Sequence, residues 1–130
     1  MAIKITSFSP QKPKGQKEQL SFRDDGIYWF LYPHFTQLYA QTGQMIDLYG
    51  ISNFRSEDLL KLKSIIEKAI TITNDQPDQW NHEVTVIIKS KKQILYESVF
   101  KSDVLATLNA LKKITLEAIN NNAVIVFEGL

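Results

Sequence analysis

The stretch that decides the fold is residues 24–50, DDGIYWFLYPHFTQLYAQTGQMIDLYG. Half of the aromatic side chains of the chain lie between Phe22 and Tyr39. Large side chains recur there at steps of three and four residues, which is the spacing of one face of an α-helix. The stripe runs through Tyr28, Leu31, Tyr32, Phe35, Leu38, Tyr39 and Thr42. This pattern predicts a central helix against which the rest of the domain packs.

Pro33 leaves two interpretations of this helix open. Inside a helix, proline removes a hydrogen bond and clashes with a carbonyl of the preceding turn, at a cost of about 3 kcal/mol. In the first turn it costs little, because those amides have no helical partner. The helix therefore begins near Ile27 with a kink near Trp29, or it begins near Tyr32 after an irregular segment. We favour the first interpretation because the stripe continues through Pro33.

Turn and cap residues bound the helix on both sides. Asp24, Asp25 and Gly26 form a turn signal, and either aspartate can cap the helix that follows. Gly43 is expected to end the helix as a C-terminal cap. Farther along, Asn120–Asn122 predicts a second turn, because asparagine tolerates left-handed backbone.

The remaining patterns predict six strands and two further helices. Helical spacing follows Ser56 and Ser102, which we expect to cap those helices. Residues 50–55 and 90–93 are expected to be a loop and a turn. Alternating or continuous apolar residues, typical of strands, mark residues 2–8, 18–23, 45–49, 80–89, 94–100 and 123–127.

We expect these elements to form an α+β fold in the order ββαβ-α-ββαβ. One mostly antiparallel sheet of five to six strands would carry three helices on one face. The chain is expected to be a single domain over residues 1–130, with a mobile hairpin loop at residues 9–17. An internal duplication of a ββαβ unit stays an open alternative. The expected core contains Ile3, Phe22, Phe35, Leu38, Leu62, Ile66, Val84, Val86, Leu108, Leu111 and Ile125.

Composition narrows the classes of function. Fifteen Lys and Arg residues stand against fourteen Asp and Glu, giving a net charge of +1, and there is no cysteine. Near-neutral charge argues against binding nucleic acid by neutralising many phosphates. Such binding through Lys89, Lys91 and Lys92 with Trp80 is therefore the weakest hypothesis. No secretory signal and no run of about 18 apolar residues is present, so we expect a soluble, cytoplasmic protein without a membrane partner.

No motif in the chain predicts catalysis. There is no GxSxG elbow and no glycine-rich phosphate loop. His34 and His82 lack a second ligand at metal-binding spacing, so we expect no metal and no cofactor. His34 is expected to be a half-exposed helix residue and His82 a strand residue bonded to a neighbour. Asp47 is expected to form a structural salt bridge with Arg23 or Arg55.

The aromatic segment carries the functional hypothesis. Exposed Tyr and Trp side chains are over-represented in protein interfaces. We therefore expect a non-enzymatic protein-interaction module that binds a protein or a second copy through residues 27–50. It would be an inhibitor, an immunity-type protein or a self-associating domain. The candidate binding residues are Tyr28, Trp29, Phe30, Tyr32, His34, Asp47 and Tyr49.

Two alternatives compete with this hypothesis. In the first, the helix is covered all round and its aromatic residues are ordinary core, which the exposure of Trp29 and Phe30 would decide. In the second, the protein is a small-molecule binder or an enzyme. Its pocket would lie beside the same helix and be lined by Tyr28, Tyr32, Tyr39 and His34.

Overall fold

In the part of the chain that the structure describes, six strands and three helices follow one another in the predicted order ββαβ-α-ββαβ. The computed structural model describes residues 2–9, 18–23, 25–88 and 90–129, and their side chains except those of residues 18, 19, 22, 23 and 85–88. Of the predicted hairpin loop at 9–17, all but residue 9 lies outside this part of the chain. The elements are β1 (Ala2–Phe8), β2 (Glu18–Arg23), α1 (Gly26–Thr42), β3 (Ile51–Phe54), α2 (Glu57–Asn74), β4 (Gln79–Ile88), β5 (Lys91–Phe100), α3 (Lys101–Asn120) and β6 (Val124–Gly129).

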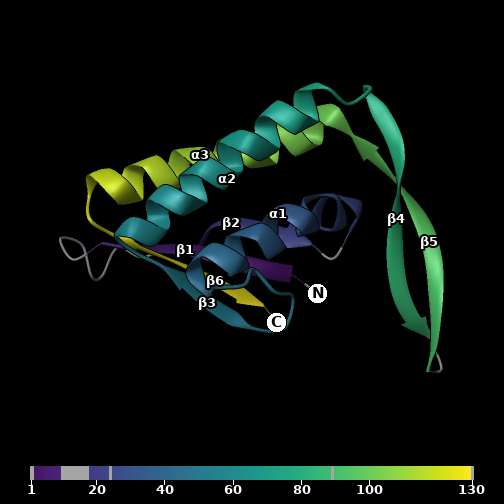
Figure 1. Ribbon diagram of the computed structural model, residues 1–130, viewed down its shortest axis with the longest axis horizontal. Helices are drawn as coiled ribbons and strands as arrows, with labels where there is room; N and C mark the ends of the chain where they lie inside the picture. The colour runs from purple at the N-terminus through teal and green to yellow at the C-terminus, as the bar shows by residue number, and fades with distance from the viewer. Residues whose placement is uncertain (1, 10–17, 24, 89, 130) are drawn as a thin grey trace.

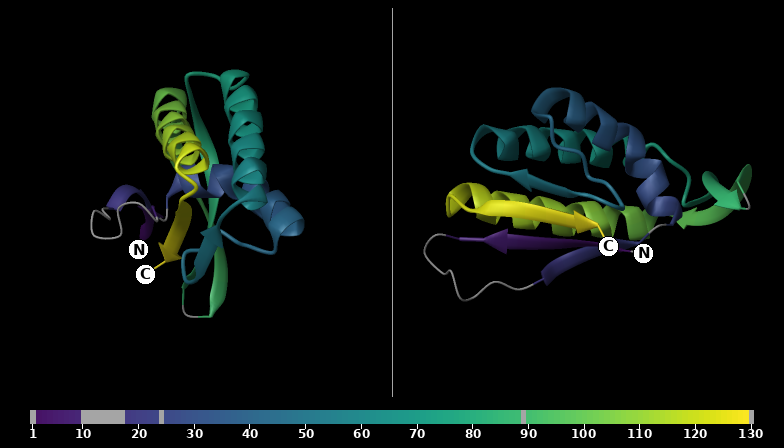
Figure 2. Two further views of the ribbon diagram at one scale, coloured as in Figure 1. Left: turned by 90° about the vertical axis from the view of Figure 1, so that its left-hand side faces the viewer. Right: turned by 90° about the horizontal axis from the view of Figure 1, so that it is seen from below.

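The strands form two separate sheets. Among the described residues, four of them make an antiparallel sheet in the order β2-β1-β6-β3, and β4 pairs only with β5. The α+β class and the antiparallel pairing are confirmed, whereas the prediction of one sheet of five to six strands is wrong. Helices α2 and α3 lie side by side along the four-stranded sheet, with α1 beside α2 (Figures 1 and 2). The β4–β5 hairpin extends from one end of this body.

The main core lies between the helices and one face of the four-stranded sheet. Successive strand residues alternate sides: Ile3 and Ile5 of β1 are buried, whereas Lys4 between them is exposed. On the central strand β6, Ile125 and Phe127 are buried likewise. Predicted core residues that the structure confirms as buried are Ile3, Phe35, Leu38, Leu62, Ile66, Val84, Leu108, Leu111 and Ile125. The side chains of Phe22 and Val86 lie outside the described residues.

Helix α1 confirms that the aromatic segment forms one helix through Pro33, whereas the kink near Trp29 stays a prediction. It begins at Gly26 and continues through Pro33. The Asp25 carboxylate caps it by accepting hydrogen bonds from the backbone N–H groups of Ile27 and Tyr28. Gly43 ends it in the left-handed conformation, with φ of 74°, as predicted. Asp24 lies outside the described residues.

The strand predicted at residues 45–49 is wrong. This segment is irregular, and the strand β3 instead occupies Ile51–Phe54, within the predicted loop. The apolar alternation that suggested a strand has another cause, because Ile46 and Leu48 are buried in the main core from a loop. The backbone carbonyl of Ile46 accepts a hydrogen bond from the Tyr28 hydroxyl at 3.0 Å, so it has a partner without any strand.

Some other caps and boundaries differ from prediction. Helix α3 begins at Lys101, with Phe100 as its N-cap, because the Lys101 N–H donates to the Asp78 carbonyl at 2.9 Å and needs no serine cap. Ser56 does occupy the N-cap of α2, but its side chain makes no capping hydrogen bond. The predicted turn at residues 90–93 is too long, since β5 starts at Lys91. The asparagine turn is confirmed, with Asn122 at φ of 54°.

The two ββαβ halves are arranged differently. In the first half, the hairpin of β1 and β2 belongs to the four-stranded sheet; in the second, the hairpin of β4 and β5 does not. Strands β3 and β6, which would be equivalent, lie next to each other in that sheet. The structure therefore does not support the alternative of an internal duplication.

Gly129 on β6 provides a test of how closely the irregular segment around Asp47 and Leu48 packs on this strand. Its N–H donates to the Gly50 carbonyl at 2.7 Å. A Cβ at this position would overlap the Leu48 carbonyl and lie 2.6 Å from the Asp47 carbonyl oxygen. Because backbone cannot move aside cheaply, Gly129→Ala should lower the free energy of unfolding by about 2 kcal/mol or more.

Gly50→Ala is the matched control for this prediction. A Cβ on Gly50 meets only the Asp47 side chain, at 3.6 Å and beyond, which is ordinary contact. Urea unfolding of both variants should show a large shift for Gly129→Ala and a small one for Gly50→Ala. Equal shifts would mean that the segment does not pack on β6 in this way.

Candidate interaction surfaces

The aromatic residues of α1 mostly pack against one another and the core. Tyr28 is 2% exposed. Its ring centroid lies 5.3 Å from that of Trp29, 6.0 Å from Tyr32 and 5.5 Å from Phe35. Trp29 and Phe30 are partly buried and pack against the core cluster. The low exposure of Tyr28, Trp29 and Phe30 therefore favours packing over binding for these three residues.

Phe30 is covered by the hairpin rather than by the four-stranded sheet. Its ring lies 4.9 Å from that of Trp80 and 5.7 Å from that of His82, both on β4. His82 is thus in ring contact with Phe30 in an edge-on arrangement. Trp80 is half-buried in this packing, far along β4 from the lysines at the other end of β5. Trp80 therefore does not join Lys91 and Lys92 in one surface, and Lys89 lies outside the described residues.

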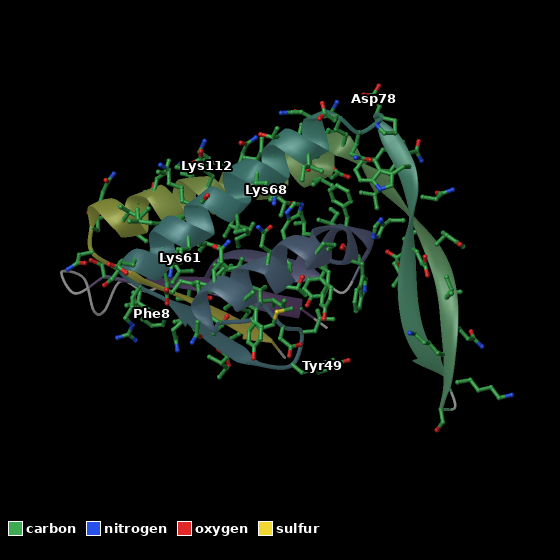
Figure 3. The ribbon with its side chains drawn as sticks, in the orientation of Figure 1. Phe8, Tyr49, Lys61, Lys68, Asp78 and Lys112 are labelled. Atoms are coloured by element: carbon green, nitrogen blue, oxygen red, sulfur yellow. The ribbon has the colours of Figure 1, made fainter. Side chains whose placement is uncertain are left out.

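His34 is buried, so the prediction that it is half-exposed is wrong. It is 8% exposed on α1. Burial lowers the pKa of His34 below its ordinary 6.5, and the positive charge of Lys68 on α2 lowers it further. Lys68 lies on the side of α2 toward α1 (Figure 3), where its Nζ donates to the Gln37 side chain at 3.0 Å. His34 is therefore part of the α1–α2 packing and unavailable to a partner.

Asp47 and Tyr49 lie at the surface, in the irregular segment before β3. Asp47 forms no ion pair with Arg55, and the Arg23 side chain lies outside the described residues, so the salt-bridge prediction is wrong for Arg55. The Asp47 carboxylate accepts a hydrogen bond from the Tyr49 N–H at 3.2 Å. Tyr49 is 71% exposed, and Tyr32 and Tyr39 on α1 are also exposed. Of the predicted binding residues, Tyr32, Asp47 and Tyr49 are thus exposed.

The β4–β5 hairpin, which we call the arm, exposes more of its apolar surface. It stands beside the end of the body, with β5 outermost in Figure 1. Every residue of β5 from Lys91 to Ser98 is exposed, including Ile94 (55%), Leu95 (48%) and Tyr96 (69%). Ile94 and Tyr96 share the face of the arm that points away from the body, and Leu95 lies on the other face. Both faces thus present apolar side chains to solvent.

The base of the arm is fixed to α1. The Gly26 N–H donates to the Glu97 carboxylate at 2.8 Å. A Cβ on Gly26 would lie 2.6 Å from the Val99 side chain, which shows how closely the helix start approaches β5. Val99 is 1% exposed, so the arm passes from buried to exposed within two residues. On β5 the burial ends at this base, whereas on β4 it continues to Val84, which is 3% exposed.

The described part of the chain gives little support to a ligand pocket beside α1. Tyr28 and His34, two of its expected lining residues, are themselves buried. A shallow hollow of about 340 Å³ lies instead where the arm meets α3. It is lined by Asp78, Phe100, Lys101, Ser102 and Leu105. Among the described residues, no group of three or more His, Asp or Glu is placed to hold a metal ion.

Comparisons with protein-family models, with curated proteins and with solved structures found no match to this chain. Among the helices that the structure describes, none combines the length and apolar character needed to cross a membrane. The argument for function therefore rests on the surfaces themselves.

Sequence reasoning missed the exposed residues of the arm, although a signal was present. Ile94, Leu95 and Tyr96 are consecutive apolar residues in a strand. Consecutive strand residues point to opposite faces, so such a run requires a sheet covered on both faces or an exposed one. The predicted fold has all three helices on one face of the sheet, which leaves nothing to cover the other face. The run could have directed attention to β5.

The buried His34 predicts how stability changes with pH. Because its pKa is lowered in the folded state, the unfolded state binds the proton more readily, so folding is favoured at high pH. Its contribution is complete above the unfolded pKa of 6.5 and is lost as pH falls toward the folded value. Urea midpoints should therefore drop between about pH 7.5 and pH 5. His34→Gln should reduce that drop, and an unchanged pH dependence would contradict the assignment.

Gly26 predicts a coupling between the helix start and the arm. Gly26→Ala should destabilise the protein by about 1–3 kcal/mol, because the new methyl group overlaps Val99. Val99→Ala should be destabilising alone but should give the methyl group room. In a double-mutant cycle, the double variant should lose less free energy of unfolding than the sum of the single losses. Strict additivity would show that the two residues do not touch.

Proposed function

We propose that the protein is a non-enzymatic protein-interaction module whose main binding element is the arm. The observation that carries this proposal is the exposure of β5 from Lys91 to Ser98, with Ile94, Leu95 and Tyr96 in the middle. An isolated two-stranded hairpin is marginally stable in water, and an exposed apolar one invites pairing with another chain. A partner that covers this surface would stabilise the hairpin and remove its apolar residues from solvent.

The mode of binding that fits the arm is strand addition. In this mode, main-chain hydrogen bonds to a sheet edge give affinity, and side chains on alternate positions give specificity. The four-stranded sheet offers less to a partner. Its open face carries charged residues, since Lys4 and Glu128 lie opposite each other there and are both exposed. The edge strand β3 is short, and its Asn53 N–H already donates to the Gln44 side chain at 3.0 Å. The arm is therefore the better site for an added strand.

The exposed tyrosines of the aromatic segment form a second candidate surface. Tyr39 on α1 is exposed, and so are Tyr49 and Ile51 (67%), two residues apart at the start of β3. This surface keeps the original hypothesis of binding through residues 27–50 testable. An inhibitor, an immunity-type protein and a self-associating domain all remain consistent with either surface. The cytoplasmic location expected from the sequence stays a prediction.

Site-specific photo-crosslinking in host cells tests the proposal. A benzophenone amino acid would replace Tyr96 on the arm, Tyr39 on α1, or Asn109, an exposed residue on α3 that serves as control. We expect one discrete protein adduct from position 96 and none above background from position 109. Adducts from position 39 alone would move the site to the aromatic segment. Adducts from neither position 96 nor position 39 would overturn the proposal.

A further inference from the structure

We propose that β5 pairs with β5 of a second copy of this chain in antiparallel orientation, joining two arms into one four-stranded sheet. The inference rests on the proposed function, since it names the partner of the arm. A two-fold axis perpendicular to the arm would relate the copies, as in most soluble homo-oligomers. Each arm then covers the open edge of the other.

The edge of β5 is open in the single chain. Within the described residues, β5 pairs with β4 alone, and the four-stranded sheet adds no strand to it. In an antiparallel ladder, alternate residues direct their N–H and C=O groups away from the paired strand. Along residues 91–98 these groups face solvent together with exposed side chains. Such an edge is a template for another strand.

The charges along β5 select the orientation and the partner. Lys91 and Lys92 stand at the start of the strand, and Glu97 stands near its end. A parallel copy would place lysine against lysine. An antiparallel copy places the lysines of each strand against the glutamate of the other. The strand is thus complementary in charge to itself, which is what a two-fold interface requires.

One register satisfies this complementarity within the exposed part of β5. With the axis at Ile94, the two Ile94 residues face each other, and Lys91 faces Glu97 of the second copy. Lys92 then faces Tyr96, and the pairing spans residues 91–97. It stops before Val99, which is buried against the body. Glu97 uses Oε2 to accept the Gly26 N–H, and a carboxylate offers a second oxygen to a lysine.

Crosslinking of single cysteines tests the register directly. The chain has no cysteine, so each variant carries one thiol. We expect Ile94→Cys to form a disulfide-linked dimer rapidly under mild oxidation. Asn109→Cys, exposed on α3, is the control and should form it no faster than random collision. Equal rates for the two variants would overturn the proposed pairing.

Charge reversal tests the partner in solution. Sedimentation equilibrium from about 1 µM to about 1 mM, the range of weak complexes, should show a shift from the 14.9 kDa monomer toward twice that mass. Lys91→Glu should weaken the dimer about tenfold, because two glutamate pairs then face each other. Adding Glu97→Lys to Lys91→Glu should restore it. Circular dichroism must show that each variant is folded.

The outcomes separate this inference from the proposed function. A protein that stays monomeric to the highest concentration, and whose photo-crosslinked adduct from position 96 has another mass, would overturn self-pairing and leave the interaction module standing. A dimer that is insensitive to Lys91→Glu, or that the double variant fails to restore although it folds, would also overturn it. A monomer with no adduct would overturn both.

Discussion

Gly26 brings the first turn of α1 into contact with β5, and the position of the arm depends on this contact. With no side chain, Gly26 lets the Val99 methyl groups approach the helix backbone, and its N–H reaches the Glu97 carboxylate. Asp25, one residue earlier, satisfies the next two amides of the helix. Phe30, one turn later, packs on Trp80. Helix start, cap and arm base thus form one packing unit.

This unit explains how an aromatic helix near the surface can bury several of its rings. Tyr28 turns inward and its hydroxyl finds the Ile46 carbonyl, so burying it leaves no polar group unpaired. Trp29 and Phe30 are covered partly by their neighbours and by the arm. The base of the arm provides this cover. Beyond Val99, the apolar residues of β5 face solvent.

The sequence predicted local structure well and long-range pairing poorly. The order of elements, the Gly43 cap and the Asn122 turn follow from residue types acting on their own backbone. The separation of the arm from the main sheet could not be predicted in this way. An alternating pattern indicates that one face of a strand is covered, but it does not indicate which element covers it. The strand predicted at residues 45–49 failed for the same reason: Ile46 and Leu48 alternate inward from a loop. The run Ile94–Tyr96 indicated that β5 is covered on both faces or exposed, but which of the two holds depends on where β5 lies in the fold.

Residue-resolved amide hydrogen exchange in dilute solution tests most directly that the arm is a formed hairpin with open edges. In a free two-stranded ladder, every second amide of each strand points to its partner. We therefore expect protected and unprotected amides to alternate along residues 91–98 of the monomer, next to continuous protection in α3 and β6. Uniformly fast exchange along these residues would mean that the hairpin does not form. Uniform protection in the monomer would mean that the arm lies against the body, and either result would contradict this account.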